Sequence, residues 1–309
     1  MKFRSPRRAM SRSALGALAF AGLLAGAARG DPLEQTFEVK PDVRVEIELL
    51  SGSIEIRAID ADEVRIQASG DLEIDASRSG RRISIRAPSG RWLPGRSGTH
   101  VDLEVELPRN SRITARTQNG KVHAEGVAGE ITLHTANGSI EVEGTPPEAY
   151  LEAMNASIKF EGEGSEVTAR TLHGEIELKG VTGAVEASTL SGKIRVEGDA
   201  IERAVLRTMA GQIELDASLT KRARVEAKTY SGQVKLRLPE DTSARFDVQS
   251  FSGGIDSDFE SRFADSDESG RRGWRHGPGR RLSFVVGEGD ARISIESFSG
   301  GVKIERGGR

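Results

Sequence analysis

The chain has 309 residues, a formal net charge of −3 and no cysteine. The lack of cysteine excludes disulfides, thiolate metal sites and cysteine nucleophiles. The near-neutral charge argues against a dedicated nucleic-acid binder, which usually carries a basic face. The chain also has 36 glycines and only 5% aromatic residues, a composition that suits many short strands joined by tight turns.

Residues 1–30 are predicted to form a secretory signal peptide. A basic start (residues 2–12) precedes ALGALAFAGLLAGAA (residues 14–28), an apolar run too short for a comfortable membrane span. An uncleaved anchor is one alternative. A twin-arginine signal is another, although the residues after Arg7-Arg8 lack the expected hydrophobic character. We expect a protein exported to the periplasm, the cell surface or the medium, with no integral membrane span after cleavage.

Residues 31–110 are interpreted as an N-terminal cap with irregular β-strands. Segments such as VRVEIELLSGSIEIRA (residues 43–58) and VDLEVELP (residues 101–108) alternate apolar and polar residues. Their spacing drifts, and the apolar parity shifts by one near Val64 and Ile66. We expect the first turns of the fold that follows, since terminal repeats are usually atypical. A separate small β domain is the alternative.

Residues 111–309 carry a repeat of about 18 residues. TLHGEIELKG (residues 171–180) returns as TLSGKIRVEG (residues 189–198). The turn glycine of each unit defines position zero. This position is occupied by Gly120, Gly138, Gly174, Gly192, Gly211, Gly232, Gly253 and Gly300, with Ala156 filling one slot and Gly52 opening the pattern upstream. Apolar residues at positions −7, −5, +2 and +4 alternate with polar ones, which predicts two half-buried strands per unit.

Two short strands cannot bury their own apolar face, so the units are expected to stack. We predict an all-β, single-stranded β-solenoid (β-helix) with rungs of about 18 residues. The alternative is an antiparallel β-sandwich of stacked hairpins. Position +2 favours the solenoid, because it holds only isoleucine or valine and a stack places like residues above like.

Position −3 is a column of hydroxyl residues. Its members are Thr117, Thr135, Thr171, Thr189, Thr208, Thr229, Ser250 and Ser297, with Ala153 as the exception. They share the parity of the buried positions, so we expect them to point inward and to pass hydrogen bonds along the stack. This parity disfavours an outward-facing ice-binding surface.

Position −2 is a line of residues that becomes apolar and bulkier toward the C-terminus. It runs through Gln118, Ala136, Met154, Leu172, Leu190, Met209, Tyr230, Phe251 and Phe298. By parity these side chains face away from the core. Either they pack against neighbouring turns, or they form an exposed binding edge. In the second interpretation the anchors are Met209, Tyr230, Phe251, Phe298 and Trp274, and the partner is an envelope protein, a glycan or a lipid.

Residues 256–281 form a charged loop with an acidic first half and a basic second half. The basic residues are Arg271, Arg272, Arg275, Arg280 and Arg281. One interpretation is a solvated loop. The other is a site where these arginines bind an anion or a partner.

The Thr-x-Ser/Asn-Gly-x-Ile-x-Val turns, the signal peptide, and the charged loop followed by SFSGGVKI (residues 297–304) carry a resemblance. Over residues 37–309 the chain resembles a bacterial β-strand-repeat family of unknown function labelled putative adhesins, which belongs with the toastrack-type envelope domains. The resemblance implies a surface or periplasmic protein, or a sensory module of an envelope-stress system. It supplies no catalytic residues.

We predict no catalytic residues, no cofactor and no metal site. The outward acids Glu125, Glu143, Glu161 and Glu197 are interrupted by Lys179, so a weak calcium site is only an alternative. The histidines lack the spacing of a zinc site. The sequence thus predicts a non-enzymatic envelope scaffold or binding domain and leaves its oligomeric state open. The alternatives are a polysaccharide-acting β-helix enzyme and a ligand-sensing module.

Overall fold

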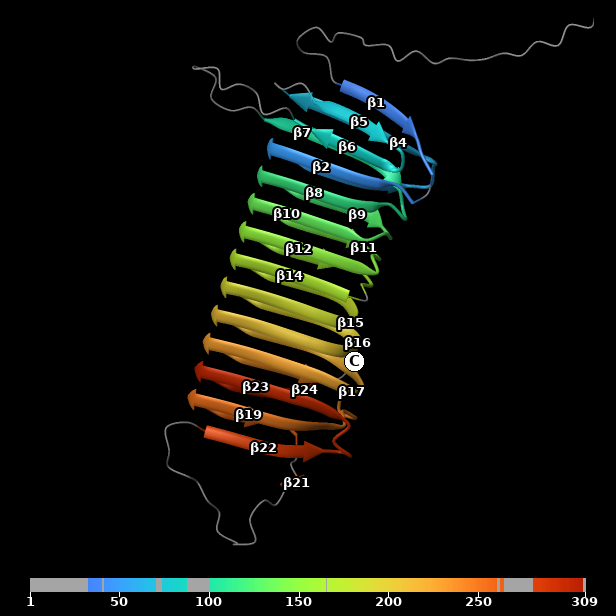
Figure 1. Ribbon diagram of the computed structural model, residues 1–309. Coiled ribbons are helices and arrows are strands. Elements are labelled where there is room, and N and C mark those ends of the chain that lie inside the picture. The colour runs from blue at the N-terminus through green and yellow to red at the C-terminus, as the bar shows by residue number, and fades with distance from the viewer. Residues whose placement is uncertain are drawn as a thin grey trace, which may run out of the picture.

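The computed structural model describes residues 33–40, 42–70, 74–87, 100–164, 166–259, 262–263 and 280–307. Within these residues the regular structure consists of β-strands stacked as the rungs of one elongated body (Figure 1). None of the described segments is a helix that is long and apolar enough to cross a membrane. The predicted signal peptide and most of the charged loop lie outside the described residues.

Each rung has two strands, and equivalent strands of successive rungs form two columns. The first column contains β2 (Arg44–Ser51), β6 (Arg82–Arg86), β8 (Arg112–Asn119), β10 (Ile131–Asn137), β12 (Glu148–Asn155), β14 (Glu166–His173), β19 (Ala244–Ser252) and β23 (Ala291–Ser299). The second contains β3 (Ile54–Ile59), β7 (Val101–Pro108), β9 (Val122–Val127), β11 (Ile140–Gly144), β13 (Ile158–Glu161), β18 (Val234–Leu238), β20 (Ile255–Ser257) and β24 (Val302–Arg306). Three longer strands, β15 (Ile176–Ser191), β16 (Ile194–Ala210) and β17 (Ile213–Ser231), each run from the second column of one rung into the first column of the next.

Strands within a column pair in parallel, and the register follows the sequence repeat. Leu133 of β10 lies between Ala115 and Leu151, and Ile140 of β11 lies between Val122 and Ile158. These side chains point inward and are buried. The predicted β-solenoid is confirmed, and the parallel pairing is incompatible with the antiparallel sandwich.

Most turn positions hold glycine because neighbouring turns touch through their backbones, with Ala156 as the exception. At Gly192 φ is +153°, and a Cβ there would lie 1.9 Å from the carbonyl oxygen of Gly174. A side chain would therefore both strain this turn and clash with the next rung.

The hydroxyl column is buried as predicted, but its hydrogen bonds follow a different path. Thr135 donates to the carbonyl of Gly120 at 3.3 Å, and Thr229 donates to that of Gly211 at 3.3 Å. The hydroxyls bond to turn carbonyls of the neighbouring rung and not to one another. The expectation that they pass hydrogen bonds along the stack is wrong in this respect, because their acceptors are backbone carbonyls, and the hydroxyl of Thr117 has no partner among the described residues.

The last rung of the chain does not lie last in the stack. β23 pairs with β17 on one side and β19 on the other, and β24 lies between β18 and β20. Figure 1 shows the resulting order β17, β23, β19. The sequence series Gly232, Gly253, Gly300 therefore becomes Gly232, Gly300, Gly253 in space.

Antiparallel strands lie at both ends of the stack. β22 (Arg280–Val286) pairs with β19 and with the short β21 (Arg262–Phe263). At the other end β4 (Glu63–Gly70) pairs with β7 and with β1 (Leu33–Glu38), while β5 (Asp75–Ser79) pairs with β6. Val64 and Ile66, where the apolar parity shifts, lie on β4 and are both buried. These end strands cover sheet edges that would otherwise be free to pair with another chain.

Candidate binding site

The outer face of the first column carries an exposed apolar line next to the turns. We call it the apolar stripe. Its members in spatial order are Leu50, Met154, Leu172, Leu190, Met209, Tyr230, Phe298 and Phe251, with Gln118 and Ala136 between Leu50 and Met154. Each occupies position −2 of its rung, and their exposed fractions range from 42% to 55%. Large hydrophobic side chains gathered in this way on an otherwise charged surface mark an interaction site.

The stripe ends in three stacked aromatic rings. The ring centroids of Tyr230 and Phe298 are 4.7 Å apart with an interplanar angle of 5°, and those of Phe298 and Phe251 are 4.7 Å apart at 4°. The inserted rung produces this order, because it brings Phe298 between the other two rings. Both faces of Phe298 and one face each of Tyr230 and Phe251 are occupied by a neighbouring ring, so the stack presents mainly ring edges to solvent.

A shallow hollow of about 540 Å³ lies beside the aromatic rings and the neighbouring row of polar side chains. Arg207, Lys228 and Glu296 line it together with Met209 and the aromatic rings. The Arg207 guanidinium lies 3.0 Å from Glu226, and the Lys228 ammonium lies 3.4 Å from Glu296. The site therefore combines an apolar edge with a row of paired charges of both signs.

Ion pairing shifts the pKa values of charged side chains in this row. The hydrogen bond from Arg207 lowers the pKa of Glu226 below its ordinary value. The hydrogen bond to Glu226 raises the pKa of Lys228. Both groups are thus charged at neutral pH, each held in an ion pair within this row.

Four of the predicted anchors come together at this site. Met209, Tyr230, Phe251 and Phe298 are exposed members of the stripe, while Trp274 lies outside the described residues. Sequence analysis missed Leu50, although it holds the same slot two residues before Gly52.

The predicted basic loop is only partly visible. Arg271, Arg272 and Arg275 lie outside the described residues. Arg280 is exposed at the start of β22, and Arg281 forms an ion pair with Asp247 of β19 at 2.8 Å. Arg281 therefore ties β22 to the stack, which reduces what it can offer to an external anion.

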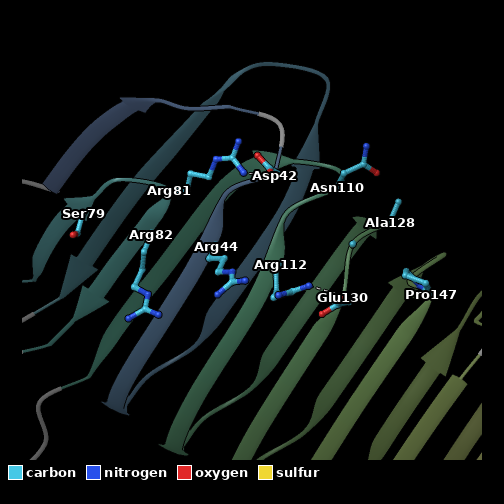
Figure 2. A pocket seen from close by; sticks show the side chains of 11 residues that line it. Asp42, Arg44, Ser79, Arg81, Arg82, Asn110, Arg112, Ala128, Glu130 and Pro147 are labelled. Atoms are coloured by element: carbon cyan, nitrogen blue, oxygen red, sulfur yellow. Dashed lines mark hydrogen bonds and ion pairs between the residues drawn. The ribbon is translucent and has the colours of Figure 1, made fainter.

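A second hollow, of about 590 Å³, lies at the N-terminal end of the stack. Figure 2 shows Arg44, Arg82 and Arg112 side by side on neighbouring strands, with Arg81 above them. Three of these arginines have carboxylate partners: Arg81 pairs with Asp42 at 2.5 Å, Arg82 with Glu46 at 3.1 Å, and Arg112 with Glu130 at 2.6 Å. Most of the positive charge here is already neutralised within the chain.

The outer face of the second column carries acids and bases interleaved in ion pairs. The Lys121 ammonium lies 2.6 Å from Glu141, and its hydrogen bond lowers the pKa of that carboxyl. A general acid for glycoside cleavage needs the opposite shift. Among the described residues no group of three or more His, Asp or Glu side chains could hold a metal ion.

A family model described as Toastrack DUF4097 matches residues 43–305. No curated protein matches the chain.

Similar solved structures come from several bacteria. A putative adhesin from Bacteroides fragilis is 10% identical with a TM-score of 0.39, and the match covers 89% of this chain and 97% of that one. A putative lipid binding protein from Parabacteroides distasonis is 11% identical with a TM-score of 0.35, covering 90% and 97% of the two chains. A putative cell adhesion protein from Clostridium sporogenes is 11% identical with a TM-score of 0.26, covering 90% and 100%.

Proposed function

The chain belongs to the Toastrack DUF4097 family, and on that basis we propose that it is a non-enzymatic protein of the cell envelope that binds a partner protein. The observation that carries this proposal is the apolar stripe, in which seven large hydrophobic side chains, from Met154 to Phe251, are exposed on successive rungs. We further propose that the protein is exported, through the signal peptide predicted at residues 1–30.

The aromatic stack favours a protein partner over a glycan. A sugar ring packs against the open face of an aromatic side chain, whereas here the rings lie face to face at 4.7 Å. Their exposed edges and the adjoining aliphatic side chains suit the apolar side chains of another protein.

The charged row beside the stripe disfavours a lipid surface. Glu226 and Glu296 alternate there with Arg207 and Lys228. Anionic head groups would meet two carboxylates at this row, whereas a protein can supply complementary groups of both signs.

The test replaces the three stacked rings together, as Tyr230→Ser, Phe251→Ser and Phe298→Ser. The matched control is Gln118→Ser together with Ala136→Ser, at position −2 of two rungs that carry no large hydrophobic side chain there. We expect the wild type and the control to retain a protein from envelope extract and the triple variant to lose it. Protease treatment of the extract should abolish retention.

Two results would contradict the proposal. One is unchanged retention by the triple variant while its circular dichroism spectrum shows a native fold. The other is binding of the wild type to protein-free vesicles or to a glycan panel that the triple variant loses.

A further inference from the structure

Four arginines stand in direct register on the outer face of the first column. We call Arg203, Arg224, Arg292 and Arg245 the arginine column. Arg203 pairs in register with Arg224, Arg224 with Arg292, and Arg292 with Arg245. All four are exposed, and adjacent strands lie about 4.8 Å apart. The inserted rung completes the column, because it places Arg292 between Arg224 and Arg245.

Among the described residues the members of the column lack carboxylate partners, as does Arg44 at the same position of β2. Elsewhere on the same face Arg112 pairs with Glu130 at 2.6 Å and Arg170 with Glu186 at 2.7 Å, each across neighbouring rungs. Within the described part of the chain no ion pair joins any of the four column arginines to an acid. Like charges placed directly opposite on neighbouring strands destabilise a sheet, so the arrangement favours an external anion.

The surrounding acids do not fill this role. Glu226 and Asp247 lie on the same face, but Glu226 pairs with Arg207 and Lys228, and Asp247 pairs with Arg281. Glu202 directly precedes Arg203, and Asp290 lies two residues before Arg292. Both are exposed, and neither forms an ion pair with the column. The guanidinium groups are therefore left to bind oxyanions from solvent.

We propose that the arginine column binds a linear carboxylated polysaccharide. A guanidinium group binds a carboxylate through two parallel hydrogen bonds. Four such groups follow a straight line over about 14 Å, which is three strand spacings. A single small anion can engage only part of this line, whereas a chain with regularly spaced carboxylates can engage all of it and gain from multivalency. The choice of a polysaccharide rests on the proposed location in the envelope but not on the apolar stripe.

Binding of polygalacturonate fragments of two, four and eight sugars tests the proposal by fluorescence anisotropy. The column variant carries Arg203→Gln, Arg224→Gln, Arg292→Gln and Arg245→Gln. The control removes four arginines that have carboxylate partners: Arg112→Gln, Arg170→Gln, Arg195→Gln and Arg237→Gln. The two variants have the same net charge, so they separate the column from a general charge effect.

We expect the wild type to bind the eight-sugar fragment at least about ten-fold more tightly than the two-sugar fragment. The column variant should lose about ten-fold or more, while the control stays within about two-fold. The stripe variant with Tyr230, Phe251 and Phe298 replaced by serine should bind as the wild type does. That result distinguishes failure of this site from failure of the proposed protein-binding surface.

A single substitution tests the proposal without relying on a variant with four substitutions, which could fail to fold. Arg224→Glu places a carboxylate between Arg203 and Arg292, so it should raise the thermal unfolding midpoint and at the same time weaken polygalacturonate binding. Equal losses in the column and control variants would overturn the proposal. So would tighter binding of the wild type to anionic vesicles or to single-stranded DNA at the same ionic strength.

Discussion

At the scale of single residues, the hydroxyl column contains two chemically identical positions with different surroundings. Thr171 donates to the carbonyls of Met154 and Ala156, at 3.3 and 3.1 Å. The hydroxyl of Thr117 is buried without a hydrogen-bond partner. The same substitution should therefore have different effects at the two positions.

We expect Thr171→Val to lower the free energy of unfolding by about 1 kcal/mol, because it leaves buried carbonyls without their donor. Thr117→Val should leave the free energy unchanged or raise it, because it removes a buried hydroxyl that lacks a partner. Urea unfolding followed by circular dichroism measures both. Equal destabilisation by the two variants would show that Thr117 has an unrecognised partner.

The inward direction of this column could be predicted from parity, but the acceptors could not. Parity states which face a side chain occupies. The acceptor depends on how closely the neighbouring turn approaches, and that distance is set by the glycine backbone contacts between rungs. For the same reason the exposure of Tyr230 could not be decided from sequence, since a bent turn would have covered it.

At the scale of strands, ion pairs across β18 and β24 make the fold sensitive to acid. Glu305 of β24 lies 2.7 Å from Lys303 and 2.9 Å from Lys235 of β18. Hydrogen bonds from these two ammonium groups lower the pKa of Glu305 to about 2 from an ordinary value of 4.5. The unfolded chain therefore binds more protons than the native one between these values.

The contribution of Glu305 to stability is thus present above about pH 4.5 and is lost as the pH falls toward 2. We expect Glu305→Gln to lower the thermal unfolding midpoint at pH 7 and to have no such effect near pH 2. High salt should shrink the difference at pH 7. The control is Glu240→Gln, at an exposed acid for which the structure shows no ion pair; it should change the thermal unfolding midpoint at pH 7 much less than Glu305→Gln does. A constant difference between Glu305→Gln and the wild type would contradict this account.

The two strands of each rung and the side chains on each face were predictable, whereas the order of the rungs was not. The pattern around Gly253 matches that around Gly300, so either rung fits against the rung of Gly232. The arginine column did carry a readable signal, because Arg203, Arg224, Arg245 and Arg292 all stand eight residues before their turn residue. Its lack of carboxylate partners became visible only with the spatial order.

At the scale of the whole molecule, the chain forms the rung of β19 and β20 before it forms the rung of β23 and β24, which lies between that rung and β17 and β18. After β18 the connection of residues 239–243 passes over one strand position, and β19 and β20 form the rung beyond it. About 10 Å must be spanned for two strand spacings, which five residues reach easily. β23 and β24 then enter between two rungs that precede them in sequence. Ile293 is thereby placed between Val225 and Phe246, and Ile295 between Ala227 and Val248.

In this topology the last rung, formed by β23 and β24, joins the C-terminal end to the rest of the stack. A chain that ends at Glu288 lacks β23 and β24, so β19, β20 and β22 lose the partner that joins them to the rest of the stack. We expect amide hydrogen exchange to lose protection in β18 to β22, while β8 to β16 stay protected, because stability in a solenoid is carried by neighbouring rungs.

The same reasoning predicts rescue by the missing piece. A peptide of residues 289–307 added to the truncated chain should restore protection in β19 and β20, because it contains β23 and β24, the strands with which they pair. A peptide carrying Ile293→Asp and Ile295→Asp should fail, since it would bring two charges into the core between Val225 and Phe246. Full protection in the truncated chain without any peptide would mean that β19 can close directly onto β17. In that case the inserted rung would only extend the stack, and the stacked rings and arginine column would be the main consequence of its position.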